Sequence, residues 1–459
     1  MALRIYENLE EARGTVLWRS RMLTWDDVPE EVQTGIRRVF GRELAPSQAA
    51  AEIVDDVRGR GDAALRDWTA RIDGETLNAL DVHAALWKVA YEGLAVDLAA
   101  AMDLAAARIR DFHARQPIPA WEMADGGGRL GQRVTPLARV GVYVPGGTAP
   151  LPSSLLMSAI PARVAGVAEV VVCTPPGEDG RVPGVTLAAA HVAGVDRVFR
   201  VGGAQAIGAM AYGTESVPRV DKIVGAGGLF TTLAKRQVYG VVGLDGLYGP
   251  TETVVVADDS ADPGWVAADL LAQAEHDVLA TAILLTPSPR LARAVQAAVE
   301  EQIERCQRRS IIEASLGNQG GIVITPDLST AVELADAFAP EHLCLSVRDP
   351  DAWAERVRNA GGLFLGEQSC EVLGDYVAGP SHIMPTGGTA RFASPVNVLD
   401  FVKITNIIAL DGETARRLSP AAGCIARAET LTAHASAAAA RAVSTRNAVA
   451  GRGTSAARL

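Results

Sequence analysis

The stretch Leu270–Asp277 places two polar side chains, Gln273 and His276, at the end of an apolar segment. Residues 265–271 are apolar at helical spacing, which predicts a helix that approaches its C-terminal end here. Gln273 and His276 are three residues apart and would therefore share a face of that helix. An amide oxygen and an imidazole nitrogen so placed could bind a metal ion together. The alternative is a polar face whose histidine bonds its own helix.

A second candidate is the dipeptide Glu341-His342, at the entry to an apolar run that predicts a strand over 343–347. In α/β proteins, loops at strand ends commonly carry the chemistry. A carboxylate beside an imidazole supplies two groups that can give or take a proton. An ordinary turn with a helix-capping glutamate would leave the same pattern.

Two further segments carry isolated polar groups. Asp375 lies in a glycine-bounded turn ahead of His382. Its carboxylate would suit Zn²⁺ or Mn²⁺, although a turn aspartate is more commonly structural. Glu429 and His434 are predicted to lie on one alanine-rich helix, five residues apart. Because all these residues come from distant segments, their spacing proposes a metal site without establishing one.

The sequence motifs that would indicate nucleotide binding are weak. No GxGxxG fingerprint follows a predicted strand. The glycines of residues 225–228 and the segment 201–205 do follow predicted strands, and their backbones could approach a phosphate closely. Tight turns account for the same glycines equally well.

These polar groups are set in a chain whose short apolar runs alternate with helix-length segments. The predicted strands are 139–145, 169–173, 197–201, 221–224, 252–257, 282–285, 321–324, 343–347 and 362–365. Such regular alternation predicts an α/β fold with parallel, doubly wound sheets and helices on both faces. Since the strands exceed one comfortable sheet, we expect two sheets.

The expected domains follow from this division. Residues 1–32 mix charged and apolar positions without a strong period and predict an N-terminal arm. A first domain is expected from 33–142 together with 252–392, and a second, inserted domain from 143–251. Beyond residue 392 the strand pattern fades, so 393–459 are expected to form a helical C-terminal piece with a disordered tail over 451–459.

The composition limits the class of function. The chain has 459 residues and a formal net charge of −11, which argues against a basic surface for nucleic acid. No apolar run reaches the ~20 residues of a membrane span, and the N-terminus lacks a signal-sequence pattern. The five cysteines form no CxxC pair, which is typical of a reducing compartment. We therefore expect a cytoplasmic protein with no membrane and no nucleic-acid partner.

Taken together, these segments resemble the histidinol dehydrogenase family over nearly the whole chain. The shared motifs are VGVYVPGGTAP at 140–150, GGAQAIG at 202–208, AKRQ at 234–237, GPTE at 249–252, DLLAQAEHD at 269–277, PEH at 340–342, GDY at 374–376, GPSH at 379–382 and LTAH at 431–434. The family performs the last two oxidations of histidine biosynthesis. The resemblance implies two incomplete Rossmann-like domains, with small N- and C-terminal pieces swapped between the subunits of a homodimer.

The resemblance also implies roles for individual residues. The zinc ligands would be Gln273, His276, Asp375 and His434, the last supplied by the partner subunit. Glu341 and His342 match the acid/base pair. The implied substrate contacts are His342, the four zinc ligands, Thr251, His382 and Glu429. Tyr143 and Gln205 match positions that touch NAD.

The chain departs from the family pattern at two places. Residues 225–228 are Gly-Ala-Gly-Gly where the family often has Gly-Pro-Gly-Asn, so Gly228 occupies an expected NAD-binding position without the asparagine side chain. Leu247-Tyr248 stands where many members have Pro-Ala, and Tyr248 is expected to bring a bulky ring near the substrate pocket. These two differences bear on the predicted affinity for NAD and on the predicted identity of the substrate.

The implied reaction is the oxidation of L-histidinol to L-histidine through the aldehyde, with two NAD⁺ reduced in turn at one zinc site. A neutral His342 would take the alcohol proton, and Glu341 would activate water for the aldehyde step. The main alternative is a paralogue with the same zinc and NAD chemistry on another small polar alcohol. A zinc hydrolase that binds no nucleotide and a catalytically inactive binding protein are the others.

Overall fold

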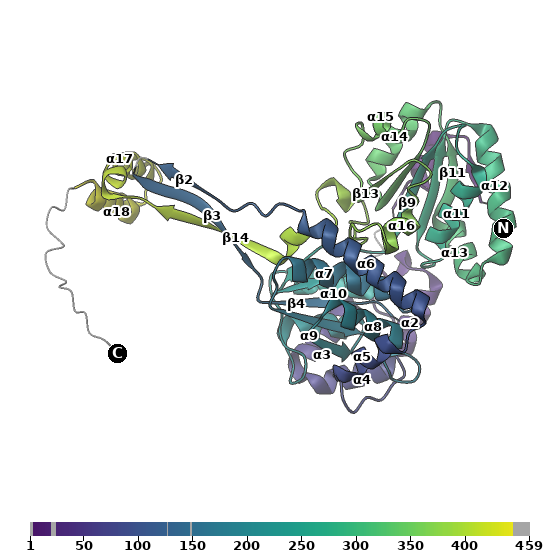
Figure 1. Ribbon diagram of the computed structural model, residues 1–459, viewed down its shortest axis with the longest axis horizontal. Helices are drawn as coiled ribbons and strands as arrows, with labels where there is room; N and C mark the ends of the chain where they lie inside the picture. The colour runs from purple at the N-terminus through teal and green to yellow at the C-terminus, as the bar shows by residue number, and fades with distance from the viewer. Residues whose placement is uncertain (1–2, 20–23, 126, 147–148, 444–459) are drawn as a thin grey trace. The chain divides into compact units, whose positions relative to one another are not determined.

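The computed structural model describes residues 3–19, 24–125, 127–146 and 149–443. It divides into two compact units (Figure 1). The first unit spans Met1–Gln116 and Pro136–Val402, and the second spans Pro117–Thr135 and Lys403–Leu459. The tail predicted at 451–459 lies outside the described residues, as do two positions of the 140–150 motif, Gly147 and Thr148.

A six-stranded parallel sheet in the first unit has the order β1-β11-β10-β9-β12-β13. Its strands are β1 (Ile5–Tyr6), β9 (Glu252–Ala257), β10 (Thr281–Thr286), β11 (Gly320–Ile324), β12 (His342–Ser346) and β13 (Gly362–Leu365). Every residue of β9 and β10 is buried, as expected for parallel strands covered on both faces.

Helices cover both faces of this sheet. One face packs on α11 (Pro263–Ala274), α12 (Pro289–Gln302) and α13 (Arg309–Gln319). The other packs on α1 (Leu9–Gly14), α14 (Leu328–Phe338) and α15 (Pro350–Ala354), and α16 (Glu371–Tyr376) follows β13. The Asp262 side chain caps α11 by accepting from the N–H groups of Gly264 and Trp265, with Pro263 at the first helical position. This defined start fixes the position of the last turn, where Gln273 lies.

The five-stranded parallel sheet of the first unit has the order β6-β5-β4-β7-β8. Its strands are β4 (Arg139–Tyr143), β5 (Glu169–Thr174), β6 (Arg197–Arg200), β7 (Lys222–Val224) and β8 (Gly243–Leu244). From β4 the chain runs to β5 and β6 on one side, then crosses to β7 and β8 on the other. Such a reversal is a topological switch point, where open α/β sheets bind ligands at the carboxyl ends of their strands.

Helices also enclose the five-stranded sheet. One face packs on α5 (Ala85–Glu92), α6 (Val96–Ala114), α7 (Pro152–Val164) and α8 (Gly184–Ala193). The other packs on α3 (Pro46–Arg60), α4 (Asp62–Ile72), α9 (Gly203–Tyr212) and α10 (Leu229–Val238), and α2 (Glu30–Phe40) packs near the start of α3. Short 3-10 helices are Trp25–Asp27, Ile303–Arg305, Thr389–Arg391 and Val398–Phe401.

The second unit combines a small sheet with two helices. The sheet has the order β14-β3-β2, formed by β2 (Trp121–Asp125), β3 (Gly128–Pro136) and β14 (Val402–Ala409). Strands β2 and β3 are antiparallel. The helices α17 (Gly412–Ala428) and α18 (Thr432–Ala442) pack against each other. No helix among the described residues is long and apolar enough to cross a membrane.

The α/β fold with two parallel sheets is confirmed, and each predicted strand is present within a residue or two. The prediction that strands end near residue 392 is wrong, because β14 follows at Val402–Ala409. The N-terminal segment also differs from the expected arm, because β1 pairs with β11 and buries Leu3 and Tyr6.

The packing of the early helices differs from the expected division as well. Helices α3–α6, which the sequence analysis assigned to the first domain, pack on the five-stranded sheet. Strand β4 is the centre of that same sheet, so the boundary expected at 142/143 falls within it. Their apolar faces pack on helices much farther along the chain: α3 on α9 and α10, and α5 on α8. The boundaries of independently folding domains stay a prediction.

Candidate active site

Glu341 lies at the amino edge of the six-stranded sheet, directly before β12. Its Oε2 accepts from the hydroxyl of Thr251 at 2.6 Å and from the backbone N–H of Glu252 at 3.1 Å. The side chain is buried, and this burial raises the pKa of Glu341 to about 7, although His342 and the two hydrogen bonds oppose the shift. A carboxyl group with this pKa can exchange a proton near neutral pH.

His342, the first residue of β12, is held between β9 and α16. Its Nδ1 lies 3.2 Å from the carbonyl oxygen of Glu252, and its Nε2 lies 3.4 Å from Oδ1 of Asp375. Burial lowers the pKa of the imidazole, but the carboxylates of Glu341 and Asp375 outweigh it and raise that pKa to about 10. The expected neutral His342 is therefore not the form that the protein alone favours, because the carboxyl groups of Glu341, Asp375 and Glu371 all raise the pKa of this ring.

Asp375 connects His342 to a second imidazole. The Nδ1 of His382 lies 2.8 Å from the carbonyl oxygen of Asp375, and its Nε2 lies 3.2 Å from the Ser154 hydroxyl on α7. Burial opposes ionisation of Asp375, yet the hydrogen bond with His342 and the charges of the neighbouring imidazoles hold the pKa of its carboxyl below the usual value. Asp375 is thus an ionised oxygen donor among histidines.

Gln273 and His276 end the helix α11. Gln273 is fully buried in the last turn. His276 lies beyond Ala274, where α11 ends, and is exposed, with its backbone N–H bonded to the carbonyl of Gln273 at 3.3 Å. The prediction that both stand on one helix is therefore wrong for His276. Burial lowers the pKa of the His276 imidazole, and the charge of Asp375 opposes this shift.

Glu429 and His434 belong to the second unit, so the cluster in the first unit contains neither. The single helix predicted for them is wrong. Helix α17 ends at Ala428, and α18 begins at Thr432. The break is at Thr430, whose φ of 62° is left-handed and incompatible with a continuing helix. Both Glu429 and His434 are exposed.

The donor groups of the first unit could supply part of a metal coordination shell, with the remaining ligand coming from elsewhere. Across the described ranges, no group of three His, Cys, Asp or Glu side chains is arranged to hold a metal ion. Of the four implied ligands, only His276 and Asp375 are of these types and lie in the first unit. Together with the amide oxygen of Gln273, they offer one nitrogen and two oxygens, which suit Zn²⁺ in an incomplete shell.

The residues implied in NAD binding lie at the carboxyl edge of the five-stranded sheet. Tyr143 ends β4, and its hydroxyl accepts from the N–H of Gly203 at 3.1 Å. Gly225 follows β7 with a φ of +118°, and a Cβ there would lie 2.2 Å from the carbonyl oxygen of Tyr143, so only glycine fits. Gly228, which precedes α10, has open space around it.

Gln205 supplies the clearest sign of a ligand-binding site at this edge. It lies in the first turn of α9 and is fully buried. Neither its amide oxygen nor its amide nitrogen has a hydrogen-bond partner within the described part of the chain. Buried amides are normally paired. The residues at this switch point therefore fit a bound polar ligand such as a dinucleotide.

Tyr248 is anchored rather than free. It is buried, and its hydroxyl donates to the carbonyl oxygen of Asp245 at 3.1 Å. The ammonium of Lys235 lies 5.2 Å from its ring centroid and pairs with the Asp245 carboxylate at 2.6 Å. The ring therefore forms part of a buried network that also holds Gly225, whose carbonyl accepts from Lys235 at 2.9 Å.

Sequence reasoning missed two residues of the site. Arg19 forms a two-pronged ion pair with Glu252, at 2.6 and 2.8 Å, and so braces the start of β9. Glu371, the first residue of α16, is fully buried and accepts from the Thr253 hydroxyl at 2.5 Å. Neither has a sequence signal, because their partners lie more than a hundred residues away.

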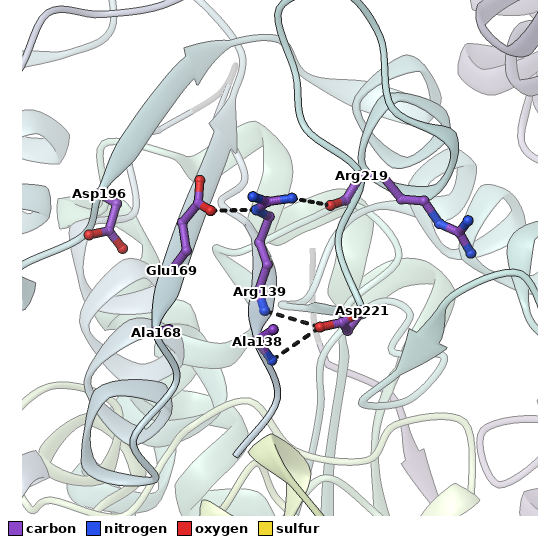
Figure 2. Close-up of a pocket in the computed structure, with 7 residues that line it drawn as sticks. All are labelled: Ala138, Arg139, Ala168, Glu169, Asp196, Arg219 and Asp221. Carbon is purple, nitrogen blue, oxygen red and sulfur yellow. Dashed lines mark hydrogen bonds and ion pairs between the residues drawn. The ribbon is translucent and has the colours of Figure 1, made fainter. Parts of the chain in front are cut away.

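A surface hollow of about 610 Å³ lies at the opposite, amino edge of the five-stranded sheet. Figure 2 shows the Arg139 guanidinium between Glu169 and the carbonyl of Arg219, and Asp221 facing the backbone N–H groups of Ala138 and Arg139. These charged groups pair with one another, so we assign the hollow no role in binding.

Comparison with known proteins shows which family the chain resembles. The family model for histidinol dehydrogenase matches residues 42–442. The histidinol dehydrogenase of Deinococcus radiodurans is 53% identical over 427 residues, 93% of this chain and 97% of that protein. That of Dehalococcoides mccartyi is 48% identical over 86% of this chain and 90% of that protein. A crystal structure of histidinol dehydrogenase from Elizabethkingia anophelis has a TM-score of 0.86 and 31% identity, covering 96% of this chain and 98% of that one.

Proposed function

Because the chain belongs to the histidinol dehydrogenase family, we propose that it oxidises L-histidinol to L-histidine through the aldehyde, with NAD⁺ and zinc as cofactors. The observation that carries this proposal is the buried pair Glu341-His342, which β9 holds beside Asp375. A carboxylate and an imidazole fixed in this way supply the proton transfers that both oxidations need.

The proposed zinc ligands are Gln273, His276 and Asp375, with His434 supplied by the partner subunit of a homodimer. The types of their donor atoms support this assignment. When bound, zinc would orient the amino alcohol and offset the charge of Asp375, while NAD⁺ would accept the hydride of each oxidation.

His342 is the proposed base of the alcohol step, in the neutral form that zinc would favour by offsetting the charge of Asp375. Its Nδ1–H donates to the carbonyl of Glu252, so Nε2 is the atom that takes the alcohol proton. Glu341 is the proposed base of the aldehyde step, in which it takes a proton from water. Its raised pKa, about 7, supports this role. Thr251 donates to Glu341, and with His382 and Glu429 it is proposed to contact the substrate.

The proposed NAD contacts are Tyr143, Gln205 and Gly228. Their position at the switch point of the five-stranded sheet supports the assignment. The unpaired amide of Gln205 supports it further, because a polar ligand would satisfy that buried group.

The proposed assembly is a homodimer with swapped terminal pieces and shared sites, in the cytoplasm. The second unit exposes large apolar side chains that an interface would cover, namely Ile404, Ile408, Leu418, Ile425 and Leu431. The five cysteines are unpaired, as a reducing compartment would leave them.

The test is NADH formation by the zinc-loaded protein with L-histidinol and with a panel of other small polar alcohols. We expect turnover with L-histidinol and formation of two NADH per L-histidine. Faster turnover of another alcohol would identify a paralogue with the same chemistry. No NADH with any alcohol, together with no NAD⁺ binding, would overturn the proposal in favour of a hydrolase.

A further inference from the structure

A glutamine that serves as a metal ligand must present its oxygen, because its NH₂ group has no lone pair to offer. The amide of Gln273 is fully buried, so its orientation is decided by protein neighbours. The two ends of an amide have nearly the same shape, and only hydrogen-bond partners distinguish them. Residues that surround Gln273 therefore determine whether it can bind a metal.

The neighbours of Gln273 select one orientation. With its nitrogen toward α16, the amide donates to Glu371 Oε1 at 3.3 Å and to Thr253 Oγ1 at 3.1 Å. Its oxygen then lies 3.0 Å from the backbone N of Glu252, whose N–H it shares with Glu341 Oε2, and 2.5 Å from the hydroxyl of Thr251. The reverse orientation keeps one bond, from the amide nitrogen to the Thr251 hydroxyl at 2.5 Å, but it sets that nitrogen against the Glu252 N–H and the amide oxygen against the carboxyl of Glu371.

The contacts of Glu371 favour this orientation of the Gln273 amide. Its side chain is buried, and the Thr253 hydroxyl occupies its Oε2 at 2.5 Å. Oε1 is thereby left facing the Gln273 amide. Since both oxygens are engaged inside the protein, Glu371 is not placed to contact the substrate itself. It stands four residues before Asp375 on α16, so one short helix carries this carboxyl and a proposed ligand.

We propose that Glu371 is a positioning residue for zinc binding. By accepting from the NH₂ group of Gln273, it keeps the amide oxygen on the side of Thr251 and Glu341. The single hydrogen of the Thr251 hydroxyl goes to Glu341, so of the two lone pairs of the amide oxygen the bond from Glu252 leaves one for a metal. This inference rests on the proposed function, since it assumes that Gln273 is a ligand.

The experiment measures the zinc affinity of the full-length protein by competition with a chelator. Glu371→Leu removes the acceptor, and we expect zinc binding to weaken by roughly 10–100-fold, the usual effect of losing a residue that orients a ligand. His276→Ala is the reference for loss of a ligand. Glu300→Leu, on the exposed part of α12, is the matched control and should keep the parental affinity.

An exchange of the two side chains separates positioning from simple loss of structure. Gln273→Glu alone sets two carboxyl groups against each other and should bind zinc more weakly than the parent. In Gln273→Glu/Glu371→Gln, the new amide can donate to the new carboxylate, so we expect at least about tenfold tighter binding than in Gln273→Glu. This comparison holds even if Glu371→Leu does not fold.

Two results would overturn the proposal. One is a folded Glu371→Leu protein with the parental zinc affinity, and the other is an exchanged double variant no better than Gln273→Glu. Failure of the proposed function is distinguishable, because it would show as a parental protein that binds zinc but forms no NADH from L-histidinol.

Discussion

The carbonyl oxygen of Glu252 lies 3.2 Å from Nδ1 of His342. Because a carbonyl only accepts, Nδ1 carries a proton there, and Nε2 is the nitrogen that can gain one. The N–H of the same Glu252 donates to Glu341 Oε2 at 3.1 Å. One residue of β9 thus sets the tautomer of the imidazole and the direction of the carboxylate, and the two bases can be tested separately.

The first prediction separates the two oxidations. His342→Ala should slow the alcohol step by about 10²–10⁴-fold, the usual worth of a general base. Glu341→Gln should instead slow the aldehyde step, where water must lose a proton. Supplying the aldehyde directly, and following NADH in single turnovers, measures the second step alone. Parental aldehyde turnover by Glu341→Gln would make Glu341 structural.

The second prediction concerns the unpaired amide of Gln205. Gln205→Leu removes a buried polar group without partners, so the free energy of unfolding of the free protein should rise by about 1–3 kcal/mol. Affinity for NAD⁺ should fall at the same time. Gln296→Leu is the control, because Gln296 donates to the carbonyl of Leu3 at 2.6 Å and its loss should destabilise. Unaltered NAD⁺ affinity in Gln205→Leu would remove Gln205 from the cofactor site.

The third prediction concerns Arg19, which faces the buried carboxylate of Glu252. Arg19→Met leaves that carboxylate unpaired, so urea unfolding should show a loss of about 3–5 kcal/mol. Arg4→Met breaks only the exposed pair with Glu11 and should cost about 0–1 kcal/mol. Equal effects of the two substitutions would mean that Arg19 does not brace β9.

The fourth prediction is a dependence on pH. Burial raises the pKa of Asp73 to about 6, with help from Glu75, so its ionisation destabilises the folded chain relative to the unfolded one. Asp73→Asn should therefore raise the free energy of unfolding by about 1–3 kcal/mol near pH 8. The gain should fade as the pH falls from about 6 toward the ordinary aspartate pKa of about 3.9, and vanish below about pH 3, where Asp73 is protonated in both states. A gain that does not change with pH would contradict this account.

The sequence predicted the parallel strands because each is buried on both faces and leaves a short apolar run, as in β9. The sequence did not predict β14. Its Ile404 and Ile408 are exposed, and its apolar and polar residues do not alternate regularly. The helices α3–α6 were assigned to the wrong sheet, because an amphipathic pattern shows that a face is buried but not against what.

Only the site residues that lie within recognisable sequence motifs could be predicted. Gln273, His276, Glu341 and Asp375 follow from a resemblance in short segments, and the structure brings them to one region. Glu371 and Arg19 act through contacts across more than a hundred residues, which no local pattern records. The carboxyl-end rule for α/β sheets also misleads here, since Glu341 precedes β12 and His342 begins it, so both lie at its amino end.

The last prediction concerns His434, which lies on α18 in the second unit. If the partner subunit supplies this ligand, each site of the homodimer combines His342 of one chain with His434 of the other. His434→Ala and His342→Ala would each be inactive alone. A hybrid dimer would then hold one site with both substitutions and one with neither. Refolding the two variants together should therefore restore NADH formation, to about a quarter of the parental rate if chains pair at random. Mixing each variant with itself is the control. Hybrids that form, as shown by differently tagged chains, and stay inactive would place His434 in the site of its own subunit.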